Sequence, residues 1–214
     1  MNYSFRKKNK IVKYVVIHYT GMKSLKLAYK KLTISSSDVS IHYLVSKDGK
    51  IFNLLCPQFK AWHAGISKWK NNNDINNYSI GIELENKGHD HGYSNFTKKQ
   101  YVSLKILINF LKKNYYISDK DFLFHSDISP NRKKDPGEKF YIYKVGLERF
   151  KNLKKFKSKI NINDMLKVYG FHEYYIKNHK ENCIMSVKRT LNYKTITPSI
   201  SKNFKRNFYN LLFS

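Results

Sequence analysis

Cysteine is almost absent from this chain of 214 residues. The two cysteines, Cys56 and Cys183, lie far apart and outside any CxxC pattern. This argues against a disulfide framework or a cysteine-ligated metal site and fits a reducing compartment. The chain also lacks an apolar run long enough to span a bilayer or to form a signal peptide. We therefore expect a cytoplasmic protein without a transmembrane segment.

Acidic residues are scarce as well: 15 Asp and Glu stand against 41 Lys and Arg, a formal net charge of +26. Such an excess attracts polyanions, for example nucleic acid, an anionic membrane or an acidic wall polymer. An AT-rich gene would also produce this excess of basic residues. Lys, Asn, Ile, Phe and Tyr are encoded by AT-rich codons, and all five are abundant here. No basic segment carries a nucleic-acid-binding motif. We favour the compositional explanation and expect no specific nucleic-acid partner.

The first two thirds of the chain alternate between strand and helix signals. A hydrophobic content of 41% suffices for a packed core. Thr97 and Gln100 have the spacing of a helix-capping box. Apolar and polar periodicity predicts strands at 13–19, 40–45, 50–54, 78–85 and 122–125, and helices at 24–32 and 97–113. This pattern indicates the α/β class, with a mixed sheet flanked by helices.

Beyond residue 160 the strand signal fades and three short helical patterns follow, at 163–169, 181–191 and 201–212. We predict a main domain over residues 1–155 and a small helical C-terminal module over 156–214. A module of this size is marginal alone, so we expect it to dock on the main domain. We expect the protein to be a monomer.

The loop 125–137 contains the most informative chemistry. It carries His125 and Asp135, and a further imidazole, His18, follows the apolar run 15–17. Two neutral imidazoles and one carboxylate make a zinc site with three protein ligands, which leaves the fourth tetrahedral position for water. Pro136 holds Asp135 extended, because the residue before a proline avoids the α region. The pattern therefore predicts a zinc hydrolase.

Two further side chains complete a catalytic set. Glu83 lies on the polar face of a predicted strand beside Gly81, whose missing side chain lets a ligand approach, and it is the best candidate for a general base. Taken alone, Glu83 or Glu85 is better explained as a partly exposed strand acid, but together with the rest of the set the catalytic interpretation is favoured. Lys133 lies two positions before Asp135, and therefore on the same side of an extended segment, where an ammonium can stabilise an oxyanion.

Five segments of the chain together resemble a known family. They occur in this order: 16–20 (VIHYT), 40–45 (SIHYLV), 61–65 (AWHAG), 79–86 (SIGIELEN) and the loop 125–137. In combination they are similar to the type-2 N-acetylmuramoyl-L-alanine amidases, which are related to peptidoglycan recognition proteins. The resemblance extends from residue 13 to about residue 145.

The resemblance implies zinc-dependent hydrolysis of the amide bond between N-acetylmuramic acid, or its 1,6-anhydro form, and L-alanine. The substrate would be peptidoglycan or a muropeptide. It implies the zinc ligands His18, His125 and Asp135, with Glu83 as the catalytic acid/base and Lys133 as the oxyanion stabiliser. It also implies a substrate groove lined by His42, Trp62 and His63.

The resemblance extends to the tail. Residues 164–171 and the helices after them resemble the small peptidoglycan-binding-type domain found behind some members, including envelope lipoproteins. Because the chain shows no lipoprotein signal, the cell envelope is the alternative to a cytoplasmic location. The alternative function is a non-catalytic peptidoglycan-binding protein, but such proteins typically lack part of the metal set. His89 and His91, in the loop 87–92, are more typical of a flexible surface loop than of a second metal site.

Overall fold

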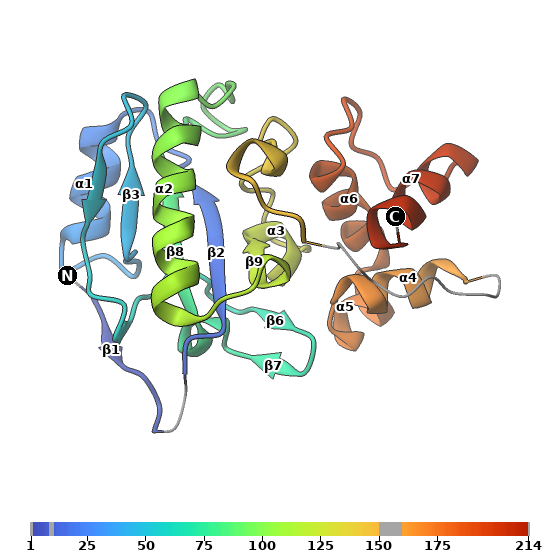
Figure 1. Cartoon of the computed structure of the whole chain (residues 1–214), viewed down its shortest axis with the longest axis horizontal. Helices are drawn as coiled ribbons and strands as arrows, with labels where there is room; N and C mark the ends of the chain where they lie inside the picture. The colour runs from blue at the N-terminus through green and yellow to red at the C-terminus, as the bar shows by residue number, and fades with distance from the viewer. Residues whose placement is uncertain (1, 9–10, 150–159, 214) are drawn as a thin grey trace.

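The computed structural model describes residues 2–8, 11–149 and 160–213. Its centre is a five-stranded sheet in the order β4-β3-β8-β2-β9 (Figure 1). The four strands from β3 to β9 are parallel, and β4 pairs antiparallel with β3. The predicted mixed sheet is therefore confirmed. The strands are β2 (Tyr14–Tyr19), β3 (Tyr43–Val45), β4 (Ile51–Asn53), β8 (Ser79–Leu84) and β9 (Phe122–Phe124).

Smaller elements complete the architecture. Two short antiparallel pairs lie outside the main sheet: β1 (Ser4–Phe5) with β5 (Phe59–Lys60), and β6 (Lys68–Trp69) with β7 (Asn72–Asn73). The α-helices are α1 (Leu25–Thr33), α2 (Lys98–Tyr115), α3 (His125–Ile128), α4 (Ile162–Tyr169), α5 (Glu173–Asn178), α6 (Lys180–Thr190) and α7 (Lys202–Phe213). The 3-10 turns among the described residues are η1 (Ile75–Tyr78), η2 (Asp119–Asp121) and η3 (Ile142–Val145).

Helix α2 covers one face of the sheet. It begins at the predicted capping box, in which the Thr97 hydroxyl accepts from the amide of Gln100 and the Gln100 side chain accepts from the amide of Thr97. Apolar side chains then recur at helical spacing, and Leu104 and Ile108 join Val15 of β2 in one buried cluster. Because successive strand residues point to opposite faces, the neighbouring strand residues face away from α2.

The C-terminal helices lie beside β9 and α3, at one edge of the sheet (right of Figure 1). Val16 and Leu123 from the sheet lie in the same buried cluster as Leu166 of α4 and Val187 of α6. The C-terminal helices therefore share a hydrophobic core with the sheet, as the expected docking requires. The predicted domain boundary at residues 155 and 156 lies outside the described residues.

The remaining differences from the predicted elements are local. Helix α5 was not predicted, because six residues are too few to establish a helical period. His125 begins the short helix α3 instead of ending β9. Within the described parts of the chain, no helix is both long and apolar enough to cross a membrane. The thiols of Cys56 and Cys183 are free.

Candidate active site

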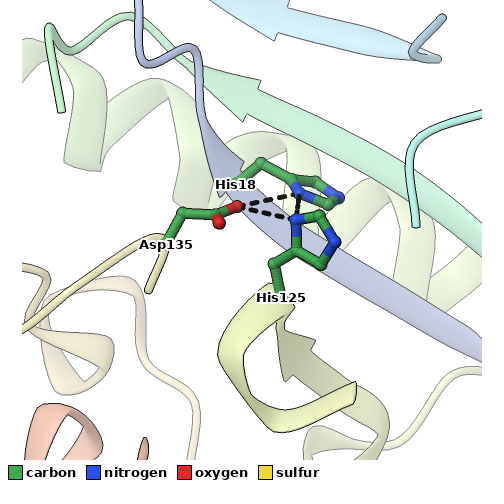
Figure 2. A group of neighbouring side chains, drawn as sticks. All are labelled: His18, His125 and Asp135. Atoms are coloured by element: carbon green, nitrogen blue, oxygen red, sulfur yellow. Dashed lines mark hydrogen bonds and ion pairs between the residues drawn. The ribbon is translucent and has the colours of Figure 1, made fainter. Parts of the chain in front are cut away.

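The sheet places the predicted metal ligands at neighbouring strand ends. His18 is near the carboxyl end of β2, and His125 directly follows β9. These strands are parallel neighbours with Ile17 opposite Phe124, so the two histidines lie side by side. The loop after α3 then brings Asp135 to the same point (Figure 2).

Three potential ligand atoms converge in this cluster. Nδ1 of His18 lies 2.8 Å from Nδ1 of His125, and each nitrogen lies 3.0 Å from Oδ2 of Asp135. Hydrogen bonds cannot satisfy this triangle. If both nitrogens carried protons, two donors would stand 2.8 Å apart. If one did not, its lone pair would face the carboxylate oxygen. A cation can accept all three lone pairs, and this N, N, O set is one that catalytic zinc uses.

The electrostatics favour the forms of these side chains that bind metals. Burial and the neighbouring His125 lower the pKa of His18 to about 4, so its ring is neutral at pH 7. Burial alone would raise the pKa of Asp135, but His125 and His18 together hold it well below its usual range. A neutral imidazole and an ionised carboxylate are the forms that coordinate a metal ion.

The second ring nitrogens of the two histidines are also engaged. Nε2 of His125 lies 3.2 Å from the carbonyl oxygen of Ala64, to which it donates when Nδ1 is the ligand atom. Nε2 of His18 lies 3.0 Å from Nδ1 of His63, whose Nε2 lies 3.2 Å from the Ser79 hydroxyl. Such outer contacts fix the orientation of metal-bound imidazoles. His63 therefore contacts His18, one of the expected metal ligands, and also lines the cavity described below.

Asn76 fixes the backbone of His63 and Ala64, the two residues that contact the histidine ligands, and it was not predicted from the sequence. Its side-chain oxygen accepts from the backbone amides of His63, at 3.0 Å, and Ala64, at 2.8 Å. Gly81 leaves room for Ile41 and His63, since a Cβ at Gly81 would lie 2.4 Å from Ile41 and 2.6 Å from the His63 ring. The space beside Gly81 is therefore filled by protein side chains, which corrects the expectation that a ligand approaches there.

Glu83 faces the same cavity. It lies opposite His18 in the register of β2 and β8, so both side chains leave the same face of the sheet. Its Oε2 atom is buried and has no hydrogen-bond partner among the described residues. Burial, together with the negative charge of Asp135, raises the pKa of Glu83 well above its usual value, while Lys133 acts in the opposite direction. A partly buried carboxylate with a raised pKa is suited to general-base chemistry.

The cluster opens into a cavity of about 610 Å³. Besides the three ligands, it is lined by His63, Glu83 and Lys133, and by residues before β3, in the loop 87–92 and at 132–134. His42 and Trp62 lie outside this lining. His42 is fully buried and its Nδ1 accepts from the amide of Gly81. The structure thus places His42 in the core, while the half-buried Trp62 donates its indole N–H to the Ser4 hydroxyl.

The loop 87–92 lies at the surface, as expected, and His91 is exposed, but His89 within it is half-buried and packed. The His89 ring stacks on Tyr93 with a centroid distance of 4.3 Å. Its Nδ1 lies 2.8 Å from the Tyr19 hydroxyl, and its Nε2 lies 3.2 Å from Glu138. His89 therefore connects the residue after His18 to the loop that follows Asp135. No motif or spacing in the sequence marks these contacts.

Residues 7–138 match the family model described as N-acetylmuramoyl-L-alanine amidase. The chain belongs to this amidase family. AmiD of Escherichia coli is 39% identical over 141 residues, which cover 60% of this chain and 50% of AmiD. The 1,6-anhydro-N-acetylmuramyl-L-alanine amidase AmpD of Haemophilus influenzae is 41% identical over 103 residues, covering 48% of this chain and 54% of AmpD. The chain thus spans about half the length of these relatives.

Solved structures of amidases share the fold of nearly all of the chain. The complex of Escherichia coli AmiD with anhydro-N-acetylmuramic acid-L-Ala-D-γ-Glu-L-Lys has a TM-score of 0.76 at 25% identity, covering 96% of this chain and 90% of that one. AmpDh3 of Pseudomonas aeruginosa also has a TM-score of 0.76, at 23% identity, covering 98% and 94% of the two chains. These coverages include C-terminal helices, so the amidase fold extends beyond the region of the family match.

Proposed function

We propose that this protein is a zinc-dependent amidase. It hydrolyses the bond between the lactyl group of N-acetylmuramic acid, or its 1,6-anhydro form, and L-alanine. One observation carries the proposal: three buried ligand atoms converge at the wall of an open cavity, beside the Oε2 atom of Glu83, which has no hydrogen-bond partner in the described part of the chain. The names of AmiD and AmpD support the choice of bond.

Each side chain of the set has a role that its position supports. His18, His125 and Asp135 would hold the zinc ion, which supplies Lewis acidity to the scissile carbonyl when bound. Glu83 accepts a proton from the attacking water and delivers it to the leaving amine. The Lys133 ammonium lies close enough to Glu83 to act on its pKa in the lowering direction. It would also stabilise the negative charge that develops on the oxyanion.

The substrate could be a soluble muropeptide or intact peptidoglycan. The AmiD structure holds an anhydro-muropeptide, and AmpD is named for the 1,6-anhydro substrate. We propose soluble muropeptides as the first substrates to test and intact peptidoglycan as the second. The predicted cytoplasmic location, monomeric state and lack of a nucleic-acid partner stay predictions.

Mass spectrometry of muropeptides tests the proposal. We expect zinc-loaded protein to release a peptide that begins with L-alanine together with the free muramic sugar. A chelator should stop the reaction, and added zinc should restore it. The Glu83→Gln variant is the matched control, because it keeps the shape of the side chain but loses the base. Zinc-loaded wild-type protein that binds muropeptides and leaves them uncut would instead identify a peptidoglycan receptor.

A further inference from the structure

A buried carboxylate lies two residues beyond the ligand His125. Asp127 belongs to the short helix α3 that His125 begins, and its side chain is fully buried. Its Oδ2 accepts from the backbone amide of Phe124 at 2.9 Å, across the start of that helix. The position of Asp127 therefore fixes the turn of backbone from which His125 projects.

The other partners of Asp127 lie outside the sheet. Arg149 donates to Oδ2 at 3.0 Å. The Tyr169 hydroxyl, at the end of α4, donates to Oδ1 at 2.8 Å, and the Ser186 hydroxyl, in α6, donates to the same atom at 3.3 Å. Two C-terminal helices thus supply hydrogen bonds to a carboxylate in the turn that carries a metal ligand.

Further contacts strengthen the same connection. The Arg149 guanidinium lies 5.3 Å from the ring centre of Phe124, just before His125, and 5.4 Å from that of Tyr169. The Ser186 hydroxyl also lies 3.1 Å from the hydroxyl of Ser126. Every residue from 124 to 127 except His125 is therefore held directly by a group from beyond residue 148.

We infer that the C-terminal helices are a positioning element for the metal site, and that they act through Asp127 on the backbone of His125. Asp127, Tyr169 and Ser186 are positioning residues in this role, since none of them touches the ligand cluster. The inference rests on the proposed function only in taking His18, His125 and Asp135 as metal ligands. It gives the C-terminal helices a task that is separate from any binding of peptidoglycan.

A purely structural role makes a different prediction. If the buried network only attached the helices, its loss would lower stability and leave metal binding unchanged below the unfolding temperature. If it positions His125, loosening it lets that ligand depart from the best geometry. The metal would then be released faster in protein that is still folded.

The test uses the full chain with cobalt or zinc bound. Tyr169→Phe removes one donor to Asp127 with little change in shape, and Ser186→Ala removes another. Leu212→Ala is the matched control: this side chain of α7 is fully buried in the same apolar cluster and has no polar atom to contribute to the network. For each protein we would measure the melting temperature, the rate of metal loss to a chelator and the visible spectrum of bound cobalt.

We expect Tyr169→Phe to release metal about tenfold faster, the lower end for residues that support metal ligands, with a changed cobalt spectrum. Ser186→Ala should act in the same direction. Leu212→Ala should lower the melting temperature and leave metal release and spectrum unchanged. Wild-type rates and spectra in both network variants would overturn the inference. Wild-type protein that binds no metal would instead refute the proposed function.

Discussion

Replacement of Asn76 by alanine should affect both folding and the metal centre. Asn76 is buried, and its side-chain oxygen accepts from the backbone amides of His63, at 3.0 Å, and Ala64, at 2.8 Å. His63 in turn lies 3.0 Å from His18 Nε2, and the Ala64 carbonyl lies 3.2 Å from His125 Nε2. One side chain therefore anchors the outer contacts of both histidine ligands.

The loss of these contacts has an energetic cost. Asn76→Ala leaves two buried amide donors without their acceptor, and each such donor costs about 1–3 kcal/mol. Water that enters the vacated space can satisfy part of this loss. We therefore expect the free energy of unfolding to fall by about 2–4 kcal/mol, a large share of the ~5–15 kcal/mol typical of a folded domain.

Urea unfolding followed by tryptophan fluorescence measures this loss, and chelator competition measures metal affinity. Asn73→Ala is the control, because Asn73 is exposed and its side chain bonds only the ammonium of Lys68 among the described residues. It should change stability by less than about 0.5 kcal/mol. We expect weaker metal binding in Asn76→Ala alone. Stability and metal affinity equal to those of the control would refute the anchoring role of Asn76.

Three further predictions concern the same region. Glu83→Gln should keep its metal and lose about 10²–10⁴ in turnover, as measured by metal analysis and muropeptide hydrolysis. Asp135→Ala should lose the metal, and stoichiometric zinc in this variant would contradict its role as a ligand. Burial lowers the pKa of His42 from 6.5 to about 3. The unfolded chain therefore takes up this proton first, and stability falls by up to about 1.4 kcal/mol per unit as the pH drops from 6.5 towards 3. His42→Asn, whose amide oxygen can still accept from Gly81, should flatten this decline in melting temperature between pH 7 and pH 4; parallel curves would contradict it.

The sequence predicted those parts of the site that follow from regular structure. Strand alternation placed Glu83 on one face of β8, and the apolar run before His18 placed it at a strand end. The capping box at Thr97 gave the start of α2. Each of these features repeats or sits at a fixed spacing, so it can be recognised without a structure.

Other parts of the site depend on contacts between distant residues. Asn76 accepts from amides twelve and thirteen positions earlier, and His89 meets Glu138 across 49 positions. Neither contact has a local pattern. The role of Gly81 was misjudged for the same reason, because only the packed structure shows that Ile41 and His63 occupy the space beside it.

On one face of the sheet, the metal site lies next to the apolar cluster that contains the C-terminal helices, and this supports the inferred coupling. Val16 and His18 are two apart on β2, so both point away from α2. Val16 is covered by the cluster that includes the C-terminal helices, whereas His18 lies farther along the strand, where the cavity opens. Helix α3 lies between them: Ile128 is part of the buried cluster, and His125 reaches the cavity. Helix α3 is therefore one direct connection between the C-terminal helices and the metal ligand His125.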